Sequence, residues 1–393
     1  MNASPPLPEI NSFALAQRVG RTVGSADAAL GGWQCIALDH HVINPVSGGL
    51  FRVTGTADAG GVTLPWSFVL KIIGRPAEET GVWASSDDIT HWNYWRREAL
   101  AYRSGLLPTN EEGGLTTPRL VDWELCQGGE EIRLWLENIQ GELGNCWPVE
   151  RYGPAARHLG QWQGQWPSRP LPTDPWLSRN WLRSRVSGGD NDAGILSDEA
   201  AWRNPVLEGA LPLSLARNGL RLWKARGILL DGLERCPQTL CHMDLWPPNL
   251  FARRSAAGHV QTALLDWSYL GLGAAGEDIG NYVFDTLHLF TLPLSDLPRL
   301  EQDVFEGYIG GLHDAGWAGS REAARFGYAA SAVLKYGFLA PALLRLAQNP
   351  EGPAYIEQRH GLPFAEFARR RAVLVAHLHG LAEEALRLLP QIT

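Results

Sequence analysis

The chain has 393 residues, of which 45% are hydrophobic and 19% are charged, and its formal net charge is −8. This composition is typical of a globular protein and excludes a mainly disordered chain, and the length predicts two lobes rather than one compact core. The negative charge argues against a nucleic-acid binder, because such a protein needs a clustered basic surface.

Five cysteines, an odd number without a CxxC pair, argue against a disulfide framework and against a structural zinc site. Cys241 is interpreted as a small buried residue rather than a nucleophile. The scattered cysteines fit a reducing cytoplasm best, so we expect a cytoplasmic protein. The N-terminus has no basic start followed by an apolar run, so no signal peptide is visible. The apolar segment YAASAVLKYGFLAPALL is interrupted by Lys335 and Pro341, which predicts buried helices rather than a membrane span.

The first predicted elements are a short helix and a run of strands. The helix covers residues 12–19, with Ser12 as a possible cap and Gly20 as its stop. Three strands follow, CIALDHHVI, FRVTGTA and WSFVLKII, separated by the turn segments NPVSGG and DAGGVTLP. A helix over residues 90–104, ended by Gly105, precedes two further strands, RLVDWEL and EIRLWLENI. Five strands with one helix predict a small, mostly antiparallel lobe.

Lys71 lies within the third strand, WSFVLKII, where it alternates with bulky apolar residues. A lysine in apolar surroundings is partly desolvated and needs an anionic partner. Glu98 is the predicted partner, because its spacing from Trp95 and Tyr102 places it on the inward face of the following helix. The alternative is that Lys71 is an edge-strand lysine that keeps other strands away.

After residue 141 helical patterns dominate, for example AARHLGQWQGQW and LPLSLARNGLRLWKARGILLDGL. One strand-and-loop region interrupts them, TLCHMDLWPPNLFARRSAAGHVQTALLDW. We therefore predict an N-terminal lobe over residues 1–136, a hinge at 137–141 and a helical C-terminal lobe over 142–393.

The segment LCHMDLWPPNLF places His242, Asp244 and Asn249 on one loop, in which two prolines exclude a regular helix. Phosphoryl transfer to a hydroxyl needs a carboxylate that accepts the hydroxyl proton and an oxygen ligand for a metal, and this loop supplies both. The alternative is a turn in which Asp and Asn bond their own backbone. Asp266 favours the first interpretation, because the hairpin between the two segments returns it beside Asn249. A carboxylate and an amide oxygen suit Mg²⁺.

The segments CHMDLWPPNLF and LLDWSYLGLGAAGEDIGNYVFD resemble the catalytic loop and the metal-binding segment of the aminoglycoside phosphotransferase and choline kinase superfamily. The family pattern is H-G-D-x-x-x-x-N, then I-D-W or I-D-F, then a G-x-x-x-x-D-L stretch. The resemblance covers roughly residues 36–285. It implies an α+β, bilobal, protein-kinase-like fold, with a small antiparallel β lobe and a larger, mainly helical lobe.

The resemblance also implies roles for the loop residues. Asp244 matches the catalytic base, while Asn249 and Asp266 match the residues that bind Mg²⁺. His242 is placed with the catalytic residues and is interpreted as bracing the loop in preference to transferring a proton. Asp278 matches a later acidic residue that braces the C-terminal lobe.

The chain departs from the family pattern at four positions near these residues. Met243 and Pro248 stand where Gly is usual or frequent, Trp246 where His or Asn is common, and Ser268 where many relatives carry a second acid. No essential group is lost, and the departures indicate a reshaped acceptor pocket.

In the small lobe, the resemblance implies that a Lys71–Glu98 ion pair orients the α- and β-phosphates of ATP. Ser47, Gly48 and Gly49 are similar to the family's nucleotide-covering loop, in which glycines let backbone N–H groups approach the phosphates, although a hairpin needs glycine in any case.

The segment LWLENIQG resembles the hinge that holds the adenine, with contacts around Glu137, Asn138 and Ile139.

The implied function is an ATP- and Mg²⁺-dependent O-phosphotransferase that acts on a small-molecule hydroxyl of an aminoglycoside, a sugar or an amino alcohol. The net charge is compatible with a cationic acceptor, and we expect neither a nucleic-acid nor a membrane partner. Four acidic residues of the late helices could meet a cation, but are interpreted as solvated: Glu277, Asp285, Asp303 and Glu306.

Two alternatives to this enzyme remain. The first is a catalytically silent, kinase-like nucleotide-binding or regulatory protein. The intact set Lys71, Glu98, Asp244, Asn249 and Asp266 argues against it. A protein kinase ranks last, because the metal segment reads LDWS rather than Asp-Phe-Gly. The sequence does not determine the oligomeric state.

Overall fold

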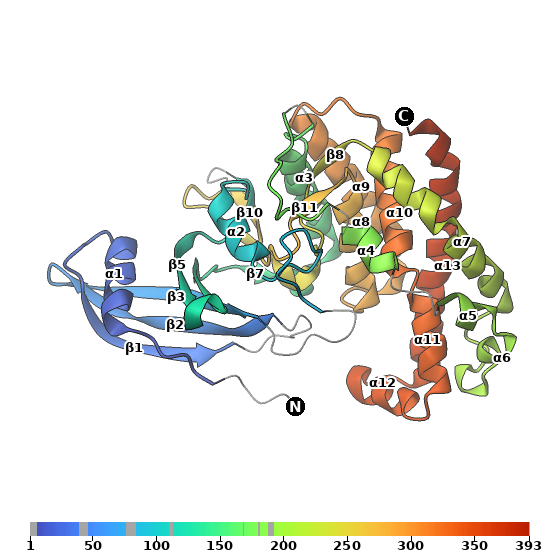
Figure 1. Cartoon of the computed structure of the whole chain (residues 1–393), viewed down its shortest axis with the longest axis horizontal. Coiled ribbons are helices and arrows are strands. Elements are labelled where there is room, and N and C mark those ends of the chain that lie inside the picture. Colours follow the sequence, from blue (N-terminus) through green and yellow to red (C-terminus); the bar gives the residue numbers. More distant parts are fainter. Residues whose placement is uncertain are drawn as a thin grey trace.

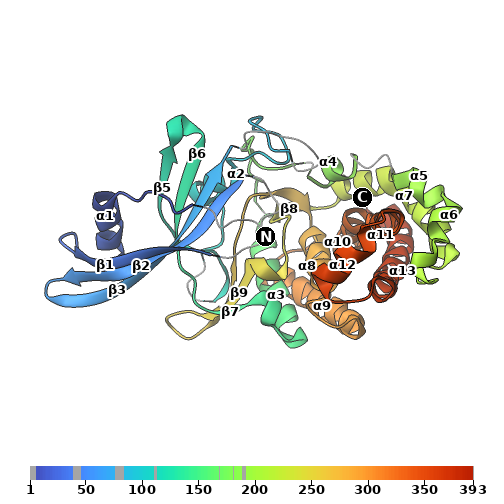
Figure 2. The ribbon, with the colours of Figure 1, turned by 90° about the horizontal axis from the view of Figure 1, so that it is seen from below.

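The computed structural model describes residues 6–38, 46–75, 84–109, 113–167, 169–179, 181–187 and 192–392. These residues form a small half built on an antiparallel sheet and a larger, mainly helical half, which lie side by side (Figures 1 and 2). The predicted α+β fold with two lobes is therefore confirmed.

The small half contains a five-stranded sheet in the order β1-β2-β3-β6-β5, with each neighbouring pair antiparallel. Its strands are β1 (Ala29–Ala37), β2 (Ser47–Ala59), β3 (Val62–Gly74), β5 (Leu120–Cys126) and β6 (Glu131–Glu137). The meander follows the predicted strands, but β1 begins earlier than expected. Residues 39–45, which include part of the first predicted strand and of the NPVSGG turn, lie outside the described residues.

The two faces of β3 are buried against different helices. Phe68 and Leu70 belong to a cluster of buried side chains that includes Leu15 and Val19 of helix α1 (Ser12–Val23). Ile73, on the opposite face, joins a cluster that contains Ala99 of helix α2 (Arg97–Ser104). Since side chains alternate along a strand, Lys71 lies on the α2 face. Helix α2 lies between the sheet and the helical half (Figure 1).

Helix α1 is longer than its sequence predicts. Its N-cap is Asn11, whose side chain accepts the Ala14 N–H at 3.0 Å, and it ends at Gly24, where φ is 74°. The predicted stop at Gly20 is wrong. A glycine inside a helix costs only about 1 kcal/mol, and a Cβ at Gly20 would lie 2.8 Å from the Ser25 carbonyl oxygen, so close packing requires a small residue there.

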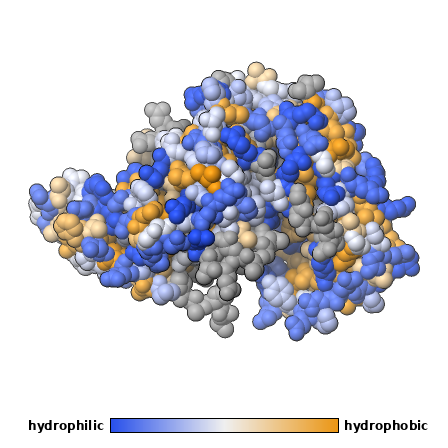
Figure 3. All heavy atoms as spheres, in the orientation of Figure 1, coloured by the Kyte–Doolittle hydropathy of each residue, from blue (hydrophilic) through white to orange (hydrophobic). Residues whose placement is uncertain are grey.

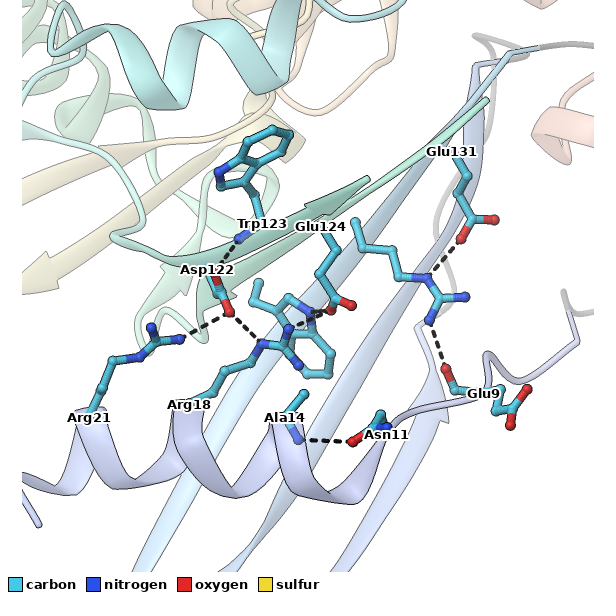
Figure 4. Close-up of polar contacts among 11 residues, drawn as sticks. Glu9, Asn11, Ala14, Arg18, Arg21, Asp122, Trp123, Glu124 and Glu131 are labelled. Carbon is cyan, nitrogen blue, oxygen red and sulfur yellow. Dashed lines mark hydrogen bonds and ion pairs between the residues drawn. The ribbon is translucent and has the colours of Figure 1, made fainter. Parts of the chain in front are cut away.

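Arg18 fastens α1 to the outer face of the sheet. Its Nε lies 2.9 Å from Asp122 Oδ2 and its Nη2 lies 2.7 Å from Glu124 Oε1, although the arginine is only 4% exposed. The guanidinium carbon is 4.6 Å from the centre of the Trp135 ring. Figure 4 shows Arg18 pointing from the helix toward both carboxylates, with Arg21 reaching Asp122 from the next turn.

Arg18→Met is therefore expected to lower the free energy of unfolding by roughly 2–4 kcal/mol, because it leaves the partly buried Glu124 without its cation and Asp122 with only the exposed Arg21. Arg21→Met is the matched control on the same helix. Arg21 also bonds Asp122, at 3.0 Å, but its side chain is 59% exposed, so its loss is expected to cost at most about 0.5 kcal/mol. Urea unfolding followed by tryptophan fluorescence measures both, and equal losses would contradict the proposed role of Arg18.

Helix α2 starts later than the predicted range of residues 90–104, although it ends as expected at Gly105, where φ is 74°. Asp88 accounts for part of the difference, because its side chain accepts the Thr90 N–H at 2.9 Å. Such a local bond offers the backbone a turn in place of a helix.

A second sheet, ordered β4-β10-β9-β7, lies against the loop that carries Asp244 and Asn249. Its strands are β4 (Gly114–Thr116), β7 (Glu142–Leu143), β9 (Leu250–Arg254) and β10 (Val260–Leu264). The predicted hairpin is present as the antiparallel pair β9–β10. The parallel strand β4 has no counterpart in the prediction, and it joins this sheet although it precedes the predicted hinge. A third pair joins β8 (Gln238–Cys241) to β11 (Gly271–Ala274).

The remaining α-helices build the large half. They are α3 (Tyr152–Gln163), α4 (Trp181–Ser187), α5 (Asp192–Ser197), α6 (Glu199–Trp202), α7 (Leu213–Arg235), α8 (Glu277–His288), α9 (Leu297–Asp314), α10 (Arg321–Tyr336), α11 (Leu339–Gln348), α12 (Gly352–His360) and α13 (Phe364–Leu388). Helices α3 and α9 approach closely, since a Cβ on Gly160 would lie 2.3 Å from the Tyr308 carbonyl oxygen.

One stretch, Arg321–Gln348, is long and apolar enough to cross a membrane by length and composition alone, but 67% of its most apolar part is buried inside the protein. It comprises α10 and α11, and a buried core helix of a globular protein has the same length and composition. On the face seen in Figure 3, apolar side chains are interspersed with hydrophilic ones rather than gathered in one broad patch.

Candidate active site

The loop after β8 is held by a buried carboxylate at the start of α8. Asp278 Oδ2 accepts the His242 N–H at 2.7 Å, and Asp278 Oδ1 accepts the Met243 N–H at 2.8 Å. Gln163 of α3 donates to the same carboxylate at 2.8 Å. Burial raises the pKa of Asp278 to about 6 against these bonds. Met243 has a φ of 68°, a conformation that glycine adopts without strain, and the Asp278 bond holds its backbone there.

His242 uses both of its ring nitrogens within the loop region. Nε2 lies 2.8 Å from the Leu265 carbonyl oxygen, and Nδ1 accepts the Asp244 N–H at 3.2 Å. Burial lowers the pKa of His242 to about 4, so the ring is neutral and carries its proton on Nε2. Because both nitrogens are occupied, this geometry favours the bracing role over proton transfer.

Asn249 and Asp266 are brought together through the residue that precedes Asp266. The Leu265 N–H donates to the Asn249 carbonyl oxygen at 2.9 Å, while the Leu265 carbonyl accepts from His242. The Asn249 side chain donates through Nδ2 to the Asp244 carbonyl oxygen at 3.1 Å, which leaves its amide oxygen as an acceptor. The three loop residues and Leu265, the residue before Asp266, therefore form one hydrogen-bonded unit.

Lys71 joins this unit to the small half. Its Nζ lies 2.6 Å from Glu98 Oε2 and 3.0 Å from Asp266 Oδ1. The Ser268 hydroxyl donates to Asp266 Oδ1 at 2.5 Å and lies 3.3 Å from Glu98 Oε2. Strand β3, helix α2 and the segment after β10 thus contribute one charged group each to a single cluster.

The pKa values of this cluster depend on a single lysine that forms ion pairs with two carboxylates. Although burial opposes its charge, Asp266 and Glu98 raise the pKa of Lys71. Burial also disfavours ionisation of Asp266, but the Lys71 ammonium and the Ser268 hydroxyl hold the pKa of Asp266 at about 2. Burial raises the pKa of Glu98 to about 7 against the attraction of Lys71. Glu98 is therefore the carboxylate that takes up a proton first.

Arg97, which the sequence analysis did not single out, fixes α2 against the segment after β10. It is fully buried, and its guanidinium donates to the carbonyl oxygens of His91, Trp92 and Trp176 at 2.6 to 2.7 Å. A longer bond of 3.3 Å reaches the Ser268 carbonyl. Burial lowers the pKa of Arg97 to about 10. Because Glu98 is the next residue, these bonds also set the position of its carboxylate.

Asp244 faces a second lysine. Its side chain is 32% exposed, and its Oδ1 lies 4.0 Å from Lys335 Nζ on α10. The same ammonium lies 3.7 Å from Asp285 Oδ2 on α8. Burial raises the pKa of Asp244 to about 7, with Lys335 opposing the shift. The sequence analysis named Lys335 only as a residue that interrupts an apolar run. A lone lysine inside such a run nevertheless needs an anionic partner, as Lys71 does.

The interpretation of the late acidic residues as solvated is wrong for two of them. Glu277 is 6% exposed, and the Asp285 side chain is 16% exposed. Asp303 and Glu306, with side chains 37% and 54% exposed, are solvated as expected. The difference depends on which face of each helix meets the core.

The predicted hinge residue Glu137 connects the two halves. Its carboxylate lies 2.7 Å from Arg253 Nη1 on β9, and its N–H donates to the Arg119 carbonyl oxygen at 2.9 Å. Neither group is therefore available to a nucleotide in this arrangement. Asn138 donates to the Ser67 hydroxyl at 2.8 Å, and Ile139 is half-buried.

The glycine-rich segment opens β2 beside Lys71. Leu50 is the register partner of Lys71, so Ser47, Gly48 and Gly49 lie along the strand just before this pair. A Cβ at Gly48 would lie 2.9 Å from a methyl carbon of Ile72, and Gly49 has a φ of 142°. Both positions therefore favour glycine.

Glu277 provides a pH-dependent test of the buried charges around this site. Burial raises its pKa from 4.5 to about 7, although its carboxylate accepts the Ala274 N–H at 3.1 Å. The folded state therefore binds more protons than the unfolded state between these values, so Glu277 makes stability fall as the pH rises from 4.5 to 7.

Glu277→Gln removes the titrating carboxylate and with it this pH dependence of stability. The glutamine amide oxygen can still accept the Ala274 N–H. We expect the variant to gain about 2 kcal/mol relative to the parent when the pH is raised from about 5 to about 8, in chemical unfolding at both values. Glu322→Gln, an exposed position on α10, is the control and is expected to show no such pH-dependent gain. A constant difference for Glu277→Gln at both pH values would contradict the assignment.

Comparison with known proteins finds one family model that matches part of the chain. The family model of the phosphotransferase enzyme family matches residues 140–323, which contain the loop with Asp244 and Asn249 and the segment with Asp266. No curated protein matches the sequence.

Three solved structures illustrate the weak structural similarities. The amicoumacin kinase hAmiN, in complex with AMP-PNP, Ca²⁺ and Ami, is 14% identical with a TM-score of 0.46, and the match covers 92% of this chain and 96% of that one. Spectinomycin phosphotransferase, in complex with ADP and spectinomycin, is 13% identical with a TM-score of 0.43, and the match covers 96% of this chain and 100% of that one. Plasmodium vivax ethanolamine kinase is 11% identical with a TM-score of 0.44, and the match covers 95% of this chain and 90% of that one. These structural similarities are weak and support no assignment. The family match, within which the predicted motifs lie, covers 184 of the 393 residues, so the chain is similar to the phosphotransferase enzyme family over this part.

Proposed function

We propose that this chain is an ATP- and Mg²⁺-dependent small-molecule kinase that transfers the γ-phosphoryl group of ATP to a hydroxyl group. The observation that carries the proposal is the cluster in which Lys71 contacts Glu98 and Asp266 at 2.6 and 3.0 Å. It joins the predicted phosphate-binding lysine of the sheet to the segment that follows the Asp244–Asn249 loop. A purely structural ion pair would not need a second carboxylate from the opposite half.

Each residue of the cluster has a role that its position supports. Lys71, oriented by Glu98, would bind the α- and β-phosphates, and the backbone of Ser47, Gly48 and Gly49 would cover them. Asp244 would accept the proton of the acceptor hydroxyl. Its carboxylate is partly exposed and its backbone is held by His242 and Asn249, so it is both accessible and oriented.

Asn249 and Asp266 fit the requirements of Mg²⁺. Both offer oxygen atoms, and substrate phosphates would complete the coordination. When bound, Mg²⁺ would neutralise the charge of the transferred phosphoryl group.

The adenine contact is proposed at the Asn138–Ile139 backbone rather than at Glu137, whose N–H and carboxylate are occupied.

The test is an ADP-release assay with Mg-ATP and a panel of amino alcohols, sugars, aminoglycosides and macrolides. We expect acceptor-dependent ADP release and a phosphorylated product by mass spectrometry. Mg-ATP at about 100 times its dissociation constant should also stabilise the protein by roughly 2.7 kcal/mol in thermal unfolding. Nucleotide binding with neither phosphorylated product nor hydrolysis would favour a catalytically silent protein, and the absence of any thermal shift would refute the nucleotide site itself.

A further inference from the structure

The chain uses lysine sparingly. Of its 34 cationic side chains only three are lysines, Lys71, Lys224 and Lys335, and the rest are arginines. Lys224 is exposed on α7, whereas the side chains of Lys71 and Lys335 are 15% and 12% exposed. Both buried lysines lie beside the proposed catalytic residues. A lysine is a compact point charge with three donors, while an arginine is a planar fork, so these two positions require the smaller cation.

The Lys335 ammonium lacks the contacts that a buried charge normally makes. Its Nζ is buried, and among the described residues no atom forms a hydrogen bond with it. Asp244 Oδ1 and Asp285 Oδ2 lie 4.0 and 3.7 Å away, beyond hydrogen-bonding distance. The ammonium lies 5.0 Å from the centre of the Trp181 ring and 5.7 Å from that of Tyr336, which favours its charge but accepts no conventional hydrogen bond. A buried ammonium without a hydrogen bond has donors that an acceptor atom can still use.

A simple counter-ion would be placed differently. Oppositely charged partners in proteins usually approach to hydrogen-bonding distance. In this chain Lys71 Nζ lies 2.6 Å from Glu98 Oε2. Lys335 instead stands off from both carboxylates. Two atoms 4.0 Å apart can both contact one oxygen at about 2.8 Å, so a hydroxyl oxygen can lie between Lys335 Nζ and Asp244 Oδ1.

We infer that Lys335 is a catalytic residue of the proposed phosphotransferase, whose ammonium donates a hydrogen bond to the acceptor hydroxyl oxygen while that hydroxyl gives its proton to Asp244. The inference rests on the proposed function, because it concerns the acceptor side of the same site. It places a catalytic residue on α10, outside the loop motifs that the sequence analysis identified.

The step balances as follows. The acceptor oxygen forms a bond to the γ-phosphorus, the bond between the γ-phosphorus and the β–γ bridging oxygen breaks, and ADP leaves. The hydroxyl proton goes to the Asp244 carboxylate. Lys335 keeps its own protons throughout and stabilises the negative charge that develops on the acceptor oxygen as its proton departs. Water can take the acceptor position, which gives ATP hydrolysis and an assay that needs no identified acceptor.

The test measures ADP release from Mg-ATP with water as the acceptor, in the parent, Lys335→Met, Lys335→Ala and the exposed control Lys224→Met. Both Lys335 variants are expected to lose roughly 100- to 1,000-fold in kcat, with the Mg-ATP dissociation constant within about twofold of the parent. Ethylamine, titrated at constant ionic strength, should restore part of kcat in Lys335→Ala, where the truncated side chain leaves space. It should not do so in Lys335→Met, where the space is filled.

The amine rescue separates a catalytic from a structural role, since a protein that is merely misfolded would not respond to it. If Lys335→Ala does not fold, Lys335→Met keeps the length of the side chain and carries the kcat comparison alone. Unchanged kcat in Lys335→Met, with Asp244→Asn inactive, would overturn the inference and leave the proposed function intact. A parent protein that releases no ADP, with water or with any acceptor of the panel, would overturn the proposed function and the inference with it.

Discussion

Asp244→Asn is expected to reduce phosphoryl transfer by roughly 10²- to 10⁴-fold while leaving Mg-ATP binding nearly unchanged. An amide has the shape of the carboxylate but cannot accept the hydroxyl proton. The loop should keep its conformation, because the Asp244 backbone, not its side chain, makes the bonds at 3.2 Å to His242 and at 3.1 Å to Asn249. Initial rates of ADP release measure the first effect, and titration calorimetry with Mg-ATP measures the second.

Asp303→Asn on α9 is the matched control. Its side chain is 37% exposed and forms an ion pair with Arg299 at 3.5 Å, so the substitution is expected to change neither rate nor binding. Equal turnover of Asp244→Asn and the parent on an identified acceptor would remove Asp244 from the mechanism. Loss of Mg-ATP binding in Asp244→Asn would instead assign the residue to the nucleotide.

Lys71→Met is expected to abolish the stabilisation by Mg-ATP and to destabilise the protein without nucleotide. The substitution leaves Glu98 and Asp266 facing each other without a cation, and breaking a buried pair in this way costs roughly 3–5 kcal/mol. Burial already raises the pKa of Glu98 to about 7, and the loss of the ammonium raises it further. Because Glu98 takes up a proton as the pH falls, the loss of stability should be smaller at about pH 6 than at about pH 8.

Lys224→Met is the control for this variant, because Lys224 is exposed and lies on α7, away from the cluster in the sequence and in the fold. Thermal unfolding at both pH values, with and without saturating Mg-ATP, gives both readouts. A normal Mg-ATP shift in Lys71→Met would contradict the phosphate-binding role. A pH-independent loss of stability would contradict the sharing of one lysine by two carboxylates.

Much of the candidate site could be predicted from local sequence because its parts are short and contiguous. The loop from His242 to Asn249 is eight residues long, and the hairpin β9–β10 returns the chain to Asp266 by a route that turn residues reveal. Alternation along β3 placed Lys71 on the face opposite Phe68 and Leu70, and the structure places those two residues in the cluster against α1. In each case the pattern depends on the geometry of a single element.

The sequence-based predictions were wrong where contacts between distant segments determine the structure. Gly20 did not stop α1, because the following turn packs closely against it. Strand β4 pairs with β10, which lies far along the chain, and no local pattern marks such a parallel partner. Glu277 and Asp285 were taken for solvated residues, because a helical pattern does not show which neighbouring helices will cover a carboxylate.

The amino-acid sequence alone was sufficient to predict the two-lobed fold, the loop with Asp244 and Asn249, and a lysine that needed an anionic partner, because strand periodicity and turn chemistry are local properties. Only the tertiary structure decided that Lys71 serves Glu98 and Asp266 together and that Lys335 lies 4.0 Å from Asp244. These arrangements join residues separated by up to two hundred positions. Their geometry follows from how whole elements pack, since a side chain's partners are set by the elements that bury it rather than by its neighbours in sequence.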